Sequence, residues 1–271
     1  MHSMFSELSG QVRLTLLWAF RDRVMHAVLG VGLGLLLLVP VLSSFSMRQV
    51  QESAISLSLS ASSLTLLVVA TLLGASSVFR DVDRHYTRSV LGLPLARGHY
   101  LLGKFLGLVL FLFSAQVVLS ICSVLVVIYA ASTYPSELPI PWLNLFFAFV
   151  ADGLKAIVVA AVAVLFSTVS TSFTLPFFCT LAIWLTGSVS QEAYEYITGS
   201  LGENLPLVTR ISAEVAYYLL PNLTCFDFHL QAVYALPVDF SQFGGSLLYG
   251  WFYIAVLVWL AVLVFIRREF P

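Results

Sequence analysis

The stretch Phe79–Lys104, FRDVDRHYTRSVLGLPLARGHYLLGK, separates two long apolar segments and decides how the chain is organised. It holds five of the 13 lysines and arginines, although only 10% of the residues in the sequence are charged. A short basic connection between two segments that are apolar enough to enter a bilayer is typical of a loop between transmembrane helices. We therefore predict a charged surface on one side of a membrane, to which a cytoplasmic protein binds.

The composition indicates an integral membrane protein. Hydrophobic residues make up 59% of the 271 residues, and the mean hydropathy is +0.96. Charged residues make up 10%, whereas a soluble domain carries about 25%. The formal net charge is −1, and the charges are separated by loop rather than gathered into a basic face. We therefore expect no nucleic-acid partner. The three cysteines are far apart and predict neither a disulfide framework nor a metal site.

Six segments are long and apolar enough to span a bilayer, which requires about 17 to 25 residues. The predicted spans are Val24–Phe45, Ile55–Phe79, Tyr100–Tyr129, Trp142–Ser167, Phe173–Val189 and Leu247–Ile266. We therefore predict an all-α polytopic membrane protein with six transmembrane helices, forming a single transmembrane domain over residues 1–271.

The basic residues indicate the orientation of these spans. Six spans place both termini on one side, and ten lysines and arginines fall on that side of the predicted topology. Only Arg48 and Arg210 fall on the other side, where most acidic residues gather. The positive-inside rule therefore places both termini and Phe79–Lys104 in the cytoplasm. The expected location is the lipid bilayer of the cell membrane, and the inner membrane if the protein is bacterial.

Two further regions have helical patterns outside the spans. Residues 3–20 place apolar side chains at helical spacing opposite polar ones, which predicts an amphipathic helix in the cytoplasmic interface. Residues 190–246 are acidic and aromatic, and Val208, Ile211 and Val215 fit one helical face. We predict short extracytoplasmic helices in this second region, before the last span.

Residues 80–94 of the charged stretch predict a short cytoplasmic helix. Arg80, Arg84 and Arg88 recur at helical spacing, and Pro94 disfavours helix for the residue before it. A rigid helix between two spans can transmit force from a bound protein. The alternative is an ordinary inside loop whose charges only set the topology.

Asp152 and Lys155 are the opposed charges deep within a predicted span. At a spacing of i,i+3 they share one helical face and can neutralise each other. An ionisable pair within a membrane is a candidate functional site. Two interpretations stay open: a structural pair between neighbouring helices, or a part of the transport path.

The sequence predicts no catalytic, cofactor-binding or metal-binding residues. It contains neither H-E-x-x-H nor G-x-S-x-G, and its five histidines are scattered. The segment GHYLLGK, Gly98–Lys104, matches the phosphate loop of nucleotide hydrolases in its first seven positions. That loop needs a following Ser or Thr, and Phe105 stands there instead.

The tail of the charged stretch resembles a known family. The segment Leu93–Gly107, LPLARGHYLLGKFLG, is similar to the coupling region of type 2 permeases of ATP-binding-cassette (ABC) transporters, the ABC-2 family. The matching positions are Pro94, Arg97, Tyr100, Gly103 and Lys104. Tyr218–Asp227, YLLPNLTCFD, resembles the family's segment before the last span. Many members have Gly-Thr after the acidic residue of the coupling helix, whereas Arg84 follows Asp83 here.

The resemblance implies partners and a site. It implies six spans per subunit, a second permease subunit in a homodimer or heterodimer, and a cytoplasmic ABC ATPase dimer that holds ATP and magnesium. Residues 80–94 would form the coupling helix. The ATPase-coupling residues would be Arg80, Asp81, Asp83, Arg84, Arg88, Pro94 and Arg97.

We therefore predict a permease subunit of an ABC transporter, an exporter, that couples ATP hydrolysis by its partner to substrate movement and is not itself an enzyme. The alternative is a membrane-anchoring or force-transmitting subunit of an ATPase-driven complex. Such a subunit would act on a periplasmic partner through residues 190–246 without transporting substrate.

Overall fold

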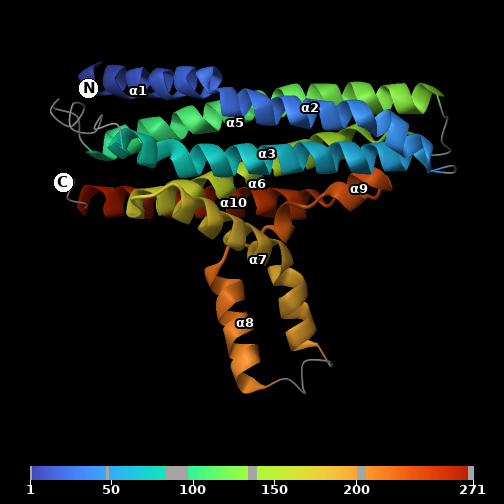
Figure 1. Cartoon of the computed structure of the whole chain (residues 1–271). Helices are drawn as coiled ribbons and strands as arrows, with labels where there is room; N and C mark the ends of the chain where they lie inside the picture. The colour runs from blue at the N-terminus through green and yellow to red at the C-terminus, as the bar shows by residue number, and fades with distance from the viewer. Residues whose placement is uncertain (1, 47–48, 84–96, 134–138, 200–205, 268–271) are drawn as a thin grey trace.

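The computed structural model describes residues 2–46, 49–83, 97–133, 139–199 and 206–267, and these residues form helices and no strand. Six of the seven described helices of 20 or more residues lie roughly parallel in a bundle (Figure 1). They are α1 (His2–Arg21), α2 (Arg23–Ser44), α3 (Val50–Asp83), α5 (Arg97–Thr133), α6 (Trp142–Val169) and α10 (Phe240–Arg267). The remaining elements are α7 (Thr174–Thr198), α8 (Leu207–Leu219), the short 3₁₀ helix η2 (Thr224–Phe226) and α9 (His229–Val233).

Five of the six predicted spans are found in the described part of the chain. Helices α2, α3, α5, α6 and α10 are long and apolar enough to cross a membrane. The other predicted span, Phe173–Val189, falls within α7 except for its first residue, and α7 is not among them. Helix α7 runs on past Val189 into polar residues, including Gln191, Glu192 and Glu195, so that it differs from a simple apolar span.

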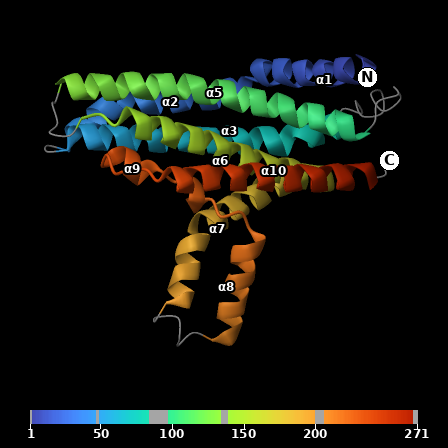
Figure 2. The same cartoon turned by 180° about the vertical axis from the view of Figure 1, so that it is seen from behind.

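After α6 and before α10, the chain still crosses from one end of the bundle to the other. Helix α7 begins against the bundle and then turns away from it, and α8 returns beside its outer half (Figures 1 and 2). Residues after α8 rejoin the bundle, and α9 lies at the end where α10 begins. This passage is therefore made in two pieces, interrupted by a projecting α7–α8 hairpin. Helix α1 and the last turns of α10 lie at one end of the bundle.

The α3–α6 pair forms the centre of the bundle. A Cβ added at Gly74 of α3 would lie only 2.4 Å from the Cβ of Ala163, so the two backbones approach closely. The Ser167 hydroxyl donates to the carbonyl of Ala75 at 3.0 Å and accepts from the backbone N–H of Val78 at 3.2 Å. Small residues and interhelical hydrogen bonds are the usual means by which helices associate within a bilayer.

Residues 3–20 lie within the helix α1, which packs along α5, and its predicted place in the membrane interface stays a prediction. A Cβ at Gly103 would lie 2.9 Å from the Cβ of Gln11, and one at Gly107 would lie 2.7 Å from that of Thr15. Both glycines of the segment GKFLG therefore allow α1 to approach α5. The overlapping segment GHYLLGK, Gly98–Lys104, lies within the helix α5, so it does not form a phosphate loop.

Candidate functional site

The charged stretch between α3 and α5 is the first candidate site. Helix α3 continues through Asp83, and α5 begins at Arg97. Arg84, Arg88 and Pro94 lie outside the described residues, and no side-chain contact is described for Asp81, Asp83 or Arg97. The coupling helix over residues 80–94 and its role in binding an ATPase therefore stay predictions.

Arg80 has partners within the chain itself. Its guanidinium group forms an ion pair with Asp22 and lies over the ring of Trp18, 4.7 Å from the centroid. Asp22 also accepts a hydrogen bond of 2.9 Å from the N–H of Val24 and thereby caps the first turn of α2. Arg80 thus ties the end of α3 to the junction between α1 and α2, a contact that spacing along the sequence did not predict.

The charge of Arg80 changes the acidity of Asp22. Partial burial of this carboxyl group favours its neutral form, but the hydrogen bonds from Arg80 and Val24 and the Arg80 charge outweigh burial. The pKa of Asp22 is therefore lowered from its ordinary value. The carboxylate stays ionised at neutral pH and can hold Arg80 in place.

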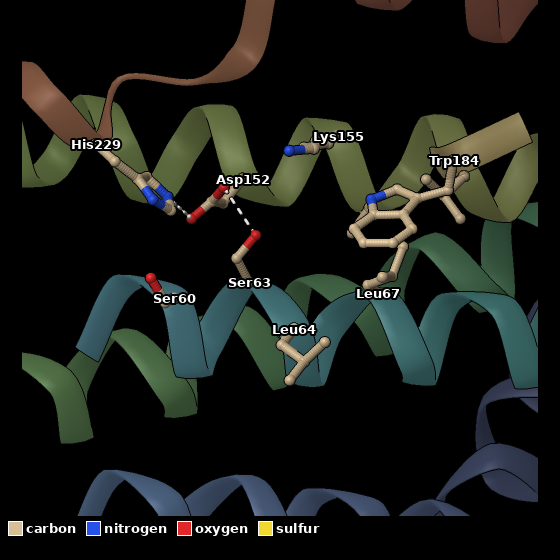
Figure 3. Close-up of a pocket in the computed structure, with 10 residues that line it drawn as sticks. Ser60, Ser63, Leu64, Leu67, Asp152, Lys155, Trp184 and His229 are labelled. Carbon is tan, nitrogen blue, oxygen red and sulfur yellow. Dashed lines mark hydrogen bonds and ion pairs between the residues drawn. The ribbon is translucent and has the colours of Figure 1, made fainter. Parts of the chain in front are cut away.

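The second candidate site is a cavity of about 200 Å³ between α3, α6, α7 and α9 (Figure 3). Its polar side chains are Ser60 and Ser63 from α3, Asp152 and Lys155 from α6, and His229 from α9. Trp184 of α7 and several aliphatic side chains complete the wall. Asp152 lies about 15 Å from the start of α6 at 1.5 Å per residue, which is about half the thickness of a bilayer core.

Asp152 is held by two other elements. Its carboxylate accepts a hydrogen bond of 3.1 Å from His229 Nε2 at Oδ2, and one of 3.2 Å from the Ser63 hydroxyl at Oδ1. The Asp152 side chain is only 2% exposed. The sequence paired Asp152 with Lys155, but in the structure its ion-pair partner is His229. The carboxylate points toward α3 and α9, which supply donors, while Lys155 lies further along α6 in the same cavity (Figure 3).

His229 lies outside the spanning helices, and its acidity reflects the two carboxylates near it. Burial alone would lower its pKa, but the hydrogen bond and charge of Asp152 and the charge of Asp227 outweigh burial and the opposing charge of Lys155. The pKa of His229 is therefore raised from its ordinary value of about 6.5. Protonation of the imidazole strengthens its pairing with Asp152.

The break between α7 and α9 is held by specific contacts near the cavity. The backbone N–H of Leu223 donates to the carbonyl of Gly187 at 3.0 Å, and Asn222 Nδ2 donates to Gln191 Oε1 at 2.8 Å. A Cβ at Gly187 would lie 2.5 Å from the carbonyl oxygen of Pro221, so this close approach requires glycine. These contacts bring the segment carrying His229 back onto the bundle opposite Asp152.

Sequence reasoning did not identify His229. The residue is 77 positions from Asp152 and lies in the region that was predicted only as short outer helices. No local spacing relates the two, because their contact depends on how α9 folds back onto the bundle. Asp152 and Lys155 were identified because charges are rare within apolar segments.

One comparison with known proteins bears on most of the chain. The family model described as "ABC-2 family transporter protein" matches residues 34–268. No curated protein matches the chain. The matched residues include all five candidate spans in whole or in part, the charged stretch and the cavity around Asp152.

Proposed function

Because the chain belongs to the ABC-2 family of transporters and is a permease subunit of that class, we propose that it is the membrane half of an exporter driven by a separate ATPase. The observation that carries this proposal is the family match over residues 34–268, which includes five helices able to span a membrane. A dimeric ABC ATPase in the cytoplasm would bind ATP and magnesium. This chain would couple ATP hydrolysis to substrate movement without breaking a bond itself.

The connection between α3 and α5 is the proposed binding surface for the ATPase. Basic residues concentrate there, and the positive-inside rule assigns that end of the bundle to the cytoplasm. Helix α1 begins and helix α10 ends at this same end of the bundle (Figure 1), which supports cytoplasmic termini. For a bacterial protein the membrane would be the inner membrane. A second permease subunit, identical or related, would complete the transporter.

Reversal of two charges tests this proposal. In Arg84→Glu/Arg88→Glu we expect reduced co-purification with the ATPase and at least a tenfold loss of the ATP turnover that the permease stimulates. Each reversed charge would repel its acidic partner on the ATPase. Arg210→Glu on α8 is the matched control, because Arg210 is an exposed arginine outside the charged stretch. Unchanged binding and turnover in the double variant would refute the proposed coupling surface.

The α7–α8 hairpin favours a second candidate function. It projects from the bundle, and Val208, Val215 and Tyr218 of α8 are 78%, 56% and 76% exposed. Such a surface suits a protein outside the membrane, on which the complex would exert force without moving a substrate. Val208→Ser/Val215→Ser would then abolish action on that protein while ATP turnover with the ATPase stays normal. Equal loss of turnover would argue against this candidate.

A further inference from the structure

Lys155 introduces a positive charge into the cavity that Asp152 does not take up. Both oxygens of Asp152 accept hydrogen bonds from His229 and Ser63. Within the residues that the structure describes, no hydrogen bond or ion pair joins Lys155 to another group. A lysine within a spanning helix is costly to insert into a bilayer, so an anion beside it would be favoured.

The cavity has one cationic region and one apolar region. The Ser60 and Ser63 hydroxyls lie on the α3 side of the charged groups, and Leu64 and Leu67 follow along the same helix (Figure 3). Trp184 covers the end beyond Lys155 (Figure 3). A volume of about 200 Å³ equals that of several waters at about 30 Å³ each. It therefore accommodates one anionic group and a few carbons of a ligand. The rest of the ligand's alkyl chain would lie outside the cavity.

The cavity also lies where the passage between α6 and α10 is broken. Trp184 belongs to α7 shortly before Gly187, and His229 belongs to the piece that returns. Non-helical backbone at membrane depth is tolerated where it is buried in protein or lines a cavity. Interrupted helices near the midplane are a recurrent way to build substrate sites in transporters. The break and the lysine without a described hydrogen bond or ion pair are independent observations that point to the same cavity.

We propose that this cavity binds the carboxylate or phosphate group of an amphiphile through Lys155, with the adjoining alkyl chain against Leu64, Leu67 and Trp184. The Asp152–His229 pair stays intact and forms the opposite side of the cavity. A cationic ligand is disfavoured, because the ammonium group of Lys155 in the same cavity would repel it. This assignment of a substrate class rests on the proposed transport function.

Trp184 supplies a direct readout of binding. The full chain would be placed in phosphatidylcholine nanodiscs and titrated with dibrominated stearic acid, whose bromines quench tryptophan fluorescence on contact. The signal of Trp184 is the difference between wild type and Trp184→Phe. We expect saturable quenching that unbrominated stearic acid reverses and stearyl alcohol, which lacks the charge, does not. Reversal by the alcohol at equal concentration would overturn the proposal.

Two variants test the role of Lys155 in this assay. Lys155→Met keeps the length of the side chain and removes its charge, and we expect at least a tenfold weaker apparent affinity for the acid. Arg210→Gln, on exposed α8, is the matched control and should keep the wild-type affinity. Circular dichroism and a monodisperse elution profile would show that Lys155→Met is folded. Wild-type affinity in the folded Lys155→Met protein would also overturn the proposal.

The chemical source of the anion is distinguished by competition. Phosphatidylglycerol added to the nanodiscs reverses the quenching if the cavity takes a phosphate of the bilayer, and leaves it unchanged if the cavity selects a carboxylate. The assay contains no ATPase, so its failure is separate from a failure of the transport function. If the protein couples normally to the ATPase but does not bind the acid, the proposed substrate class is refuted and the proposed function is not.

Discussion

The charged stretch between α3 and α5 and the cavity around Asp152 both concentrate charge, but they are built in opposite ways. In the charged stretch the charges are neighbours in sequence and Arg80 is 33% exposed at its side chain. In the cavity they come from α6 and α9, and the Asp152 side chain is 2% exposed. Screening by water makes a single exposed charge nearly dispensable for folding, whereas a buried charge depends on its partner. The first region is therefore suited to binding a soluble partner, and the second to holding a ligand within the membrane.

Loss of the imidazole should have the largest effect on stability. His229→Leu leaves Asp152 buried with only the Ser63 hydroxyl, and breaking a buried pair costs about 3–5 kcal/mol. Thermal unfolding of the purified protein would measure the loss. His99→Leu, at the start of α5, is the control and should change the midpoint little. Equal midpoints for the two variants would show that the cavity charges are as dispensable as surface charges.

A methyl group at Gly187 should disturb the cavity from a distance. In Gly187→Ala the new Cβ meets the carbonyl of Pro221 at 2.5 Å, so that the returning segment must shift. Overpacking of this kind costs about 1–3 kcal/mol. We also expect weaker pairing of His229, measured as a shift of its imidazole resonances in NMR titration. Gly30→Ala is the control, since nothing lies within 4 Å of a Cβ there. Wild-type resonances in Gly187→Ala would contradict the role of this contact.

The stability of the protein should depend on pH through His229. Its pKa is raised in the folded state, so its contribution is fully present below the unfolded value of about 6.5. That contribution is lost as the pH rises through the folded pKa. We expect the unfolding temperature to fall over this range in wild type, by less than His229→Leu lowers it. His229→Gln keeps a donor without a charge and should flatten the dependence. A slope that persists in His229→Gln would assign it to another group.

Arg80 should give the smallest effect. Arg80→Gln removes a partly exposed ion pair with Asp22, and pairs of this kind contribute about 0–1 kcal/mol. The pKa of Asp22 should rise, because Arg80 holds it below its ordinary value. Thermal unfolding measures the first effect and NMR titration the second. A loss as large as that of His229→Leu would show that the charged stretch also depends on buried pairing.

Much of the fold could be predicted from local pattern. Runs of apolar residues predict α2, α3, α5, α6 and α10, and the spacing of apolar residues predicts α1. The interruption between α7 and α9 could not be predicted in the same way, because it depends on Gly187 meeting the segment at Pro221. Hydropathy records how apolar a segment is but not whether its far half leaves the bundle.

The candidate sites were predictable to different degrees. Asp152 and Lys155 stand out because charge is rare in apolar segments, and both line the cavity. Their mutual pairing was inferred from spacing on one helix, which contains no information about donors on other helices. His229 and Ser63 supply those donors, and only the tertiary fold brings them to Asp152. The residues of the charged stretch beyond Asp83 stay predictions from sequence.

The continuity of α3 has a thermodynamic consequence. Arg80 and Ser63 belong to one uninterrupted helix and are separated by about 25 Å at 1.5 Å per residue. If closure of the ATPase displaces the end of α3, the Ser63–Asp152 distance changes with it. Energetic linkage is reciprocal. If a ligand in the cavity favours one position of α3, it changes the affinity of the ATPase for nucleotide by some factor, and nucleotide changes the affinity of the cavity for the ligand by the same factor. Binding of a ligand in the cavity would then be detected at the other end of α3, as a change in the affinity of the ATPase for ATP.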